Sequence, residues 1–215
     1  MSLFRVESLK VNGILEMDKL EIQANKIICI IGKSGSGKST FLRLLNHLDS
    51  PDQGKILYHG EDISSMDPIK LRRKITMVPQ TPVIFPGTIK ENLLIGQKFS
   101  GIELADDAYL KKVLNRISLH KSLETPAEDL SGGEKQRLSL ARAMLLDAEV
   151  FLLDEPSSAL DRATADDVVG AFIDFIKAEN KSMLMITHDL EIANRIADET
   201  IDMDQYSKAT AMNQS

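Results

Sequence analysis

The feature that most constrains this chain is a glycine-rich stretch near its start, Gly32-Lys33-Ser34-Gly35-Ser36-Gly37-Lys38-Ser39, followed by Thr40. It follows the apolar run 27–31, which is typical of a buried parallel strand, and it precedes a segment of helical character at 40–47. Glycines at such a junction let backbone N–H groups curl around an anion, and the helix start adds partial positive charge. The stretch therefore predicts a phosphate-binding P-loop, G-x-x-x-x-G-K-[ST], in which Lys38 reaches the β- and γ-phosphates and Ser39 ligates Mg²⁺.

The composition is that of an ordinary globular protein, with 43% hydrophobic and 27% charged residues among 215. The net charge of −6 argues against general nucleic-acid binding, and the basic run 70–74 is read as a solvated helix face. The single cysteine, Cys29, lies in the apolar strand and is expected to be a core residue in a reducing compartment. No apolar run approaches the roughly twenty residues that span a bilayer, and no signal peptide is expected. Any membrane connection must then come through a partner protein.

Strands and helices alternate along most of the chain, which predicts an α/β fold with a mostly parallel, doubly wound sheet. The first two strands predict an antiparallel edge at the N-terminus. The pattern changes to helices and loops at about 81–146, which predicts a helical lobe inserted into a core of about 1–80 and 147–204. Residues 205–215 are expected to form a loose polar tail of this single domain, 1–215. Strands are expected at 3–9, 14–24, 55–60, 75–79, 150–153, 183–187 and 200–203, and helices at 68–73, 88–96, 106–118, 131–146, 162–179 and 190–197.

A pair of carboxylates, Asp154-Glu155, follows the buried strand at 150–153. A carboxylate at the carboxyl end of a parallel strand lies beside the nucleotide crevice of such folds. Asp154 is expected to hold Mg²⁺, and Glu155 to polarise the attacking water as a general base. The alternative, that both side chains merely end a turn before Pro156, is weak beside a P-loop at this spacing.

A third motif, Leu130-Ser131-Gly132-Gly133-Glu134-Lys135-Gln136-Arg137, resembles the signature of the ATP-binding-cassette (ABC) ATPases. From about residue 3 to 203 the chain is similar to the nucleotide-binding domain of that family, because six motifs stand in the family's order. The remaining three are Gln80 as the Q-loop glutamine, 157–161 as the D-loop, and Thr187-His188-Asp189 with the switch histidine. The resemblance implies a P-loop NTPase core and an ATPase that uses ATP and Mg²⁺.

The resemblance also implies roles for single residues. In the family, two cassettes pair head to tail and trap ATP between one P-loop and the partner's signature. The signature residues and the D-loop are therefore expected to reach the nucleotide of the other copy, through Ser131, Gly132, Gly133 and Asp161. Gln80 is expected to contact Mg²⁺ and the attacking water, and His188 the γ-phosphate. Read without the family, Ser131 begins a capping box, and both readings can hold because a helix start is also an anion site.

One position departs from the family pattern. The family usually places an aromatic residue after the first strand to stack on adenine, whereas 9–13 reads Leu9-Lys10-Val11-Asn12-Gly13. Val11 is expected to offer apolar contact instead. The missing aromatic ring predicts weak discrimination between ATP and GTP.

The resemblance implies a motor subunit that pairs with a separate membrane permease, on the cytoplasmic face of the cell membrane. The segment 81–93 resembles the exporter form, with Phe85 and Gly87-Thr88-Ile89 before Glu91-Asn92, while 124–129 lacks the segment that full exporters carry. Standalone cassettes of the iron-export type share this combination, so the prediction is an exporter, with iron or another metal as its candidate substrate. Two alternatives stay open. One is a soluble cassette of an assembly machine, such as iron–sulfur cluster biogenesis, and the other a degenerate cassette, against which the intact Lys38, Glu155 and His188 argue.

Overall fold

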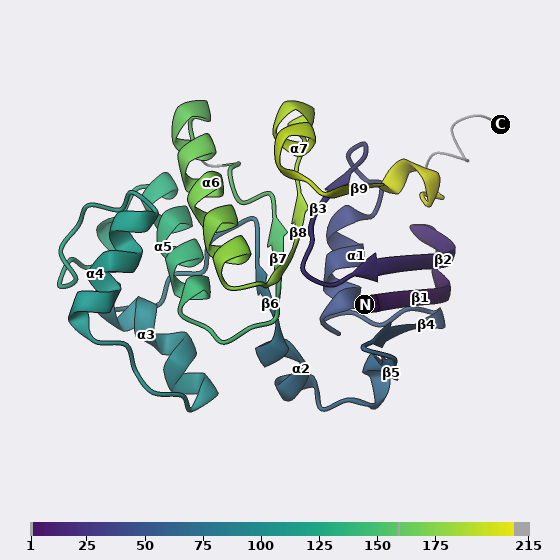
Figure 1. Cartoon of the computed structure of the whole chain (residues 1–215), viewed down its shortest axis with the longest axis horizontal. Helices are drawn as coiled ribbons and strands as arrows, with labels where there is room; N and C mark the ends of the chain where they lie inside the picture. The colour runs from purple at the N-terminus through teal and green to yellow at the C-terminus, as the bar shows by residue number, and fades with distance from the viewer. Residues whose placement is uncertain (1, 159, 209–215) are drawn as a thin grey trace. The chain divides into compact units, whose positions relative to one another are not determined.

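The structure, a computed structural model, describes residues 2–158 and 160–208, apart from the side chains of residues 162 and 163. Its elements, labelled in Figure 1, form two compact units. Unit 1 takes its described residues from Met1–Met77, Glu149–Asp154 and Lys181–Ser215, and unit 2 from Val78–Ala148 and Glu155–Asn180. The sequence placed 155–180 with the core, but this segment packs within unit 2. That the chain acts as one nucleotide-binding domain stays a prediction.

Unit 1 contains the predicted parallel sheet, with five strands in the order β6-β7-β8-β3-β9. The pairs β7–β8, β8–β3 and β3–β9 are parallel. Every residue of β7 and β8 is buried, as expected for apolar strands that are covered on both faces. The loops that follow β3 and β8 therefore leave the sheet at the same edge. The strands are β3 (Ile27–Ile31), β6 (Ile75–Val78), β7 (Val150–Asp154), β8 (Ser182–Ile186) and β9 (Glu199–Asp202).

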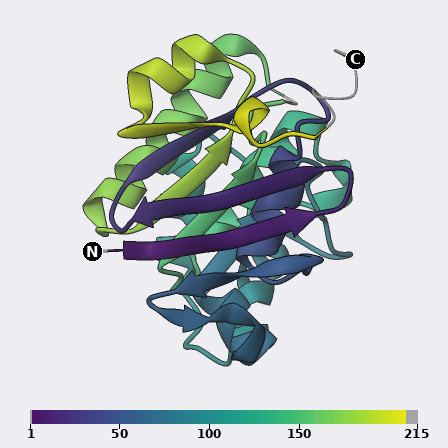
Figure 2. The same cartoon turned by 90° about the vertical axis from the view of Figure 1, so that its right-hand side faces the viewer.

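A second, antiparallel sheet in unit 1 confirms the predicted N-terminal edge (Figure 2). Its strands follow the order β2-β1-β4-β5, and Val6 of β1 lies opposite Leu20 of β2 and Ile56 of β4. The strands are β1 (Ser2–Val11), β2 (Leu15–Gln23), β4 (Gln53–Tyr58) and β5 (Glu61–Asp62). The helices of this unit are α1 (Lys38–Leu45), η1 (Ile63–Ser65), α2 (Pro68–Lys74), α7 (Leu190–Ile196) and η3 (Met203–Gln205).

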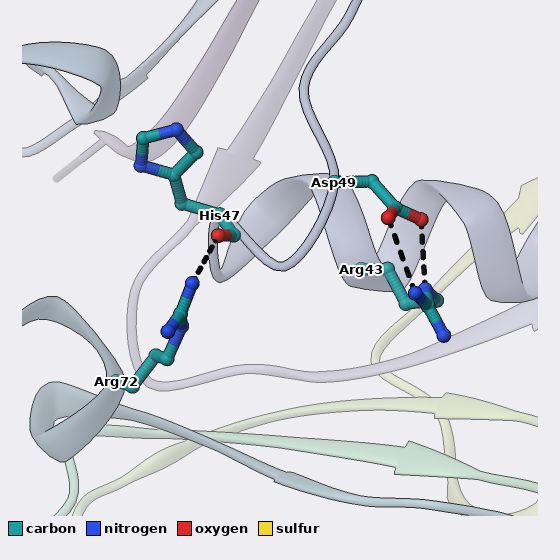
Figure 3. Close-up of polar contacts among 4 residues, drawn as sticks. All are labelled: Arg43, His47, Asp49 and Arg72. Carbon is teal, nitrogen blue, oxygen red and sulfur yellow. Dashed lines mark hydrogen bonds and ion pairs between the residues drawn. The ribbon is translucent and has the colours of Figure 1, made fainter. Parts of the chain in front are cut away.

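Helix α1, which follows the glycine-rich loop, packs against β7 and β8 and is fixed at its far end by two arginines (Figure 3). Arg43 makes a fork of two hydrogen bonds to the carboxylate of Asp49, at 2.7 and 3.1 Å. Arg72 of α2 donates from Nη2 to the carbonyl of His47 at 2.5 Å, just past the helix end. Cations at a helix C-terminus satisfy its last carbonyls and interact favourably with the helix dipole. These contacts hold the C-terminal end of α1 in place.

The last described residues of unit 1 correct the predicted loose tail from Gln205. The N–H of Glu16 donates to the carbonyl of Tyr206 at 2.9 Å, and the N–H of Lys208 donates to the carbonyl of Ile14 at 3.0 Å. The segment that follows η3 is therefore hydrogen-bonded beside the start of β2 (Figure 2). The rest of the predicted tail, 209–215, lies outside the described residues.

Unit 2 is helical, and α5 packs against α3, α4 and α6. Each of these four helices begins at a side chain that accepts a hydrogen bond from a backbone N–H of its first turn. In the part of the chain that the structure describes, no helix has the length and apolar character needed to cross a membrane. The helices are α3 (Ile89–Ser100), α4 (Asp107–Arg116), η2 (Ala127–Asp129), α5 (Gly132–Met144) and α6 (Arg162–Ala178).

Candidate functional site

The glycine-rich loop ends at Gly37, which is the N-cap of α1 and has a φ of 87°. No side chain caps this helix, whereas a side-chain oxygen caps each of the other α-helices among the described residues. The left-handed conformation of Gly37 and of Gly35, with φ of 80°, is one that side chains with a Cβ rarely adopt. The first N–H groups of α1 are thus left open for an anion, as the motif predicts.

Lys38 is only 6% exposed, and its ammonium turns back into the loop. Its Nζ donates to the carbonyls of Gly32 and Lys33, each at 2.8 Å. Both acceptors are neutral, so the charge of the ammonium is not compensated by these bonds. The hydroxyl of Ser36 is also buried and has no hydrogen-bond partner. A buried cation, an orphaned hydroxyl and an uncapped helix start together fit the oxygens of a bound phosphate chain.

Ser39 and Asp154 meet at the side of α1 that faces β7. The Oγ of Ser39 donates to Oδ1 of Asp154 at 3.1 Å, and Asp154, the last residue of β7, is 8% exposed. A hydroxyl and a carboxylate oxygen this close together are the ligands that Mg²⁺ prefers, usually beside phosphate oxygens and water. The pair therefore fits the predicted metal position.

Asp204, just past β9, holds the beginning of the loop, and the sequence did not single it out. Its Oδ1 accepts a hydrogen bond from the backbone N–H of Lys33 at 2.9 Å. A Cβ built on Gly32 would lie 2.8 Å from Oγ of Ser36 and 3.1 Å from Oδ1 of Asp204. Only glycine fits at position 32 without a shift of these groups. The signal available in the sequence was the short strand at 200–203, whose carboxyl end must approach that of β3 if the two are parallel neighbours.

A pocket of about 290 Å³ brings the switch histidine to the same loop. His188 is exposed and follows Thr187, a buried residue whose Oγ1 accepts the N–H of Asp189 at 3.1 Å. Asp189 in turn caps α7. The turn after β8 is therefore held by its own side chains, with His188 beside the P-loop. The pocket is lined by Ile31, Gly32, Lys33, Thr187, His188, Leu190, Asp202 and Asp204.

The remaining residues predicted for the nucleotide lie at the ends of unit 1 elements. Ser34 and Gly35 are exposed at the tip of the loop, and Thr40 is half-buried in the first turn of α1. Val11 is the last residue of β1 and pairs with Leu15, so it stands at the turn that joins the first two strands.

In unit 2, Gln80 and Glu155 are in direct contact. The Nε2 of Gln80 donates to Oε2 of Glu155 at 2.9 Å. Glu155 has a φ of 47°, a left-handed conformation that is unfavourable for a residue with a Cβ, and its carbonyl accepts the N–H of Ser158 at 3.1 Å. The structure thus brings together the predicted general base and the predicted Q-loop glutamine.

The signature forms the start of α5, and its serine has the predicted capping geometry. Ser131 Oγ accepts the N–H of Glu134 at 3.3 Å, while the N–H of Ser131 donates to the carboxylate of Glu134 at 2.9 Å. This backbone hydrogen bond lowers the pKa of Glu134. A Cβ on Gly132 would meet nothing within 4 Å, so the face of the signature beside Ser131 is open. Asp161 caps α6 by accepting the N–H of Thr164 at 3.1 Å.

Comparison with known proteins agrees with these features. The family described as ABC transporter matches residues 15–158. The phosphate import ATP-binding protein PstB 3 of Natronomonas pharaonis is 39% identical over 192 residues, which cover 84% of this chain and 69% of that protein. The L-cystine import ATP-binding protein TcyN of Bacillus subtilis is 34% identical over 203 residues, covering 91% and 78%. Protein STAR1 of rice is 39% identical over 180 residues, and the match covers 83% of this chain but only 52% of STAR1.

Solved structures show the same fold. The cbiO1 protein of Clostridium perfringens, part of the ABC transporter complex cbiONQ, superimposes with a TM-score of 0.82 at 24% identity over 97% of this chain and 86% of that one. A bacterial Atm1-family ABC exporter with ATP bound gives a TM-score of 0.83 at 26% identity, over 99% of this chain and 40% of the exporter. The P-loop, the buried lysine and the matching family thus lead to one conclusion: this chain belongs to the ABC transporter family, as an ATP-binding ATPase subunit.

Proposed function

We propose that this subunit works as a head-to-tail homodimer that traps two ATP molecules and drives a separate membrane permease. The observation that carries the proposal is the state of the P-loop in unit 1. An uncapped helix start and a buried Lys38 ammonium, bonded only to two neutral carbonyls, offer positive charge at one place. Phosphate oxygens would take the place of those carbonyls as acceptors for Lys38.

The proposed chemistry is positioning and electrostatics. Ser39 and Asp154 would hold Mg²⁺, with Gln80 as a further contact, and the ion supplies positive charge that offsets the charge on the phosphoryl group. Glu155 would accept the proton of the attacking water, and His188 would donate a hydrogen bond to the γ-phosphate. The bond between the γ-phosphorus and the bridging oxygen breaks as the water oxygen attacks, giving ADP and inorganic phosphate.

The partner copy would complete the site. Ser131, Gly132 and Gly133 are open to solvent or half-buried at the start of α5, where the helix dipole favours an anion. These groups would face the γ-phosphate that is bound to the other subunit. Asp161, at the start of α6, would lie at the same dimer interface.

The direction of transport stays a prediction. The relatives PstB 3 and TcyN are described as import proteins for phosphate and L-cystine, and they give no support to the iron-export subtype. The exporter-like segment 81–93 also has a local explanation. Thr88 and Glu91 form a capping box at the start of α3, and the buried amide of Asn92 donates to the carbonyls of Phe85 and Thr88 at 2.8 and 3.0 Å. Purification of the chain with its permease, followed by transport assays in inside-out and right-side-out vesicles, would decide between import and export.

We propose that the permease holds the chain at the cytoplasmic face of the membrane. This location distinguishes a transporter subunit from a soluble cassette. A cassette that serves an assembly machine, such as iron–sulfur cluster biogenesis, would not purify with a multi-span membrane protein. Co-purification with such a protein under mild detergent favours the transporter. Its absence, together with a soluble partner of fixed stoichiometry, favours the alternative.

The test of the ATPase dimer is size-exclusion chromatography of Glu155→Gln with and without MgATP. We expect binding without turnover, and therefore a shift from monomer to dimer that requires ATP. A Lys38→Met, Glu155→Gln double variant is the control and should stay monomeric, because it lacks the P-loop ammonium. A Glu155→Gln variant that hydrolyses ATP at the wild-type rate would remove Glu155 as the base.

A further inference from the structure

Tyr206 differs from the other aromatic residues of unit 1 in its exposure. Among the described residues of this unit, Phe4, Phe41 and Phe151 are 0% exposed and Tyr58 is 4% exposed. Tyr206 is half-buried and packs against the hydrophobic core of the unit, beside which Val11 and Ile14 also lie partly buried. Among the phenylalanine and tyrosine residues in the described part of unit 1, Tyr206 is thus the one whose ring can still contact a ligand.

The backbone fixes Tyr206 beside the start of β2. Its carbonyl accepts the N–H of Glu16 at 2.9 Å, and two residues later the N–H of Lys208 donates to the carbonyl of Ile14 at 3.0 Å. Lys208 also forms an ion pair with Glu16. These contacts hold the backbone at Tyr206 and two residues beyond it.

The start of β2, where Tyr206 is held, lies beside the P-loop. A Cβ built on Gly37, at the end of the loop, would lie 3.0 Å from Cγ2 of Ile14 and 2.4 Å from Cδ2 of Leu15. At the beginning of the loop, Asp204 accepts the N–H of Lys33. The segment 204–208 is therefore attached near the loop's first residues through Asp204 and runs on to Ile14, which contacts the loop's last glycine.

We propose that Tyr206, with Val11 and Ile14, forms the surface against which the base of the bound nucleotide lies. The inference rests on the proposed function, because it assumes that the phosphates occupy the P-loop. The segment 9–13, which ends β1 and enters the turn to β2, has no aromatic residue, so the segment 204–208 supplies the ring that is missing there. Stacking on an aromatic ring accepts every base, since each has a π-face. Tyr206 would therefore raise the affinity for nucleoside triphosphates without selecting adenine over guanine.

The experiment compares three ligands that share the phosphate chain. Dissociation constants for MgATP, MgGTP and magnesium tripolyphosphate are measured by calorimetry on the wild-type chain and on Tyr206→Ala. The variant should bind both nucleotides roughly tenfold more weakly, and by the same factor, because it loses the stack. Its affinity for tripolyphosphate, which has no base, should be unchanged.

Three further variants separate stacking from support of the fold. Tyr206→Phe keeps the ring and should bind both nucleotides as the wild type does. Tyr206→Leu keeps apolar volume without a π-face and should follow Tyr206→Ala. Tyr109→Ala removes another exposed tyrosine, 48% exposed on α4 of unit 2, and should leave all three affinities unchanged.

Two results would overturn the inference while leaving the proposed function intact. One is an equal loss for nucleotides and tripolyphosphate, which means that Tyr206 supports the loop. The other is unaltered nucleotide affinity in Tyr206→Ala. A wild-type chain that binds neither nucleotide nor tripolyphosphate would overturn the proposed function itself, and the inference with it.

Discussion

The side-chain amide of Gln80 donates a hydrogen bond of 2.9 Å to the carboxylate of Glu155, so a neutral donor engages the predicted base. Glu155 is also held at a φ of 47°. Strain of this kind persists only where the surrounding structure fixes it, and it is common at functional positions. The two residues form a unit, and a change in one should alter what the other does.

Replacement of Gln80 by leucine should separate binding from turnover. The variant loses the donor that orients the Glu155 carboxylate, so we expect ATP turnover to fall by about a hundredfold, within the range for a mispositioned general base. MgATP affinity should stay within about threefold, because the variant loses one proposed contact to Mg²⁺ and keeps the P-loop contacts to the phosphates. Steady-state ATPase assays and calorimetry measure the two quantities. Gln53→Leu, an exposed glutamine of β4, is the control, and unchanged turnover in Gln80→Leu would contradict the pairing.

The strain at Glu155 predicts an unusual effect on stability. A left-handed conformation costs a residue with a Cβ about 1–2 kcal/mol, whereas glycine adopts it freely and loses only about 0.5–1 kcal/mol through its larger unfolded-state entropy. Glu155→Gly should therefore have a free energy of unfolding equal to or above that of Glu155→Gln, which keeps the strain. Urea unfolding without nucleotide measures both. A clearly less stable glycine variant would show that the φ of 47° carries no cost.

The sequence predicted the positions of most strands in both sheets and of most helices, because apolar runs and turn residues are local signals. It did not predict the boundary between the units. Helix α6 has an apolar face, which predicts that this face is buried but does not identify the element that packs against it. For this reason 155–180 was assigned to the core, whereas in the structure it packs within unit 2.

The site shows the same limit in another form. Ser39 and Asp154 are separated by 115 positions, yet their contact could be predicted because each belongs to a motif with known chemistry. Lys33 and Asp204 are separated by 171 positions, and Asp204 lies in no such motif. The sequence did not predict the position of Tyr206 either. The segment pairs with β2 only through an isolated bridge between Leu15 and Ser207, and so short a pairing leaves no periodic pattern in a polar segment.

A polar cluster away from the P-loop predicts how stability depends on pH. Tyr58 donates to Oε2 of Glu149 at 2.6 Å, and Nε2 of His59 lies 2.6 Å from Oε1. Burial raises the pKa of Glu149, but these hydrogen bonds and the charges of His59 and Lys74 outweigh it, so the pKa falls below the ordinary 4.5. The folded state therefore favours the carboxylate. Its contribution is complete above pH 4.5 and is lost as the pH falls through the lowered pKa.

Glu149→Gln should then destabilise the chain by about 1 kcal/mol at pH 7, a modest value because the side chain of Glu149 is 39% exposed and screened by solvent. The difference from wild type should narrow as the pH falls below 4.5. Urea unfolding at several pH values measures the gap. Glu61→Gln, an exposed carboxylate of β5, is the control. A gap that stays constant down to pH 3.5 would assign the effect of Glu149→Gln to packing.

The single cysteine offers a direct measure of how often the strand before the P-loop opens. Cys29 is 0% exposed, and burial raises the pKa of its thiol to about 12. Only the thiolate reacts with a disulfide reagent, so labelling must wait for β3 to open. We expect labelling of the native chain to be far slower than that of the urea-unfolded chain. MgATP at a hundred times its dissociation constant should slow it about a further hundredfold, because ligand binding stabilises the native state by about 2.7 kcal/mol. Lys38→Met should lose that extra protection, and rapid labelling of the native wild type would contradict the burial of Cys29.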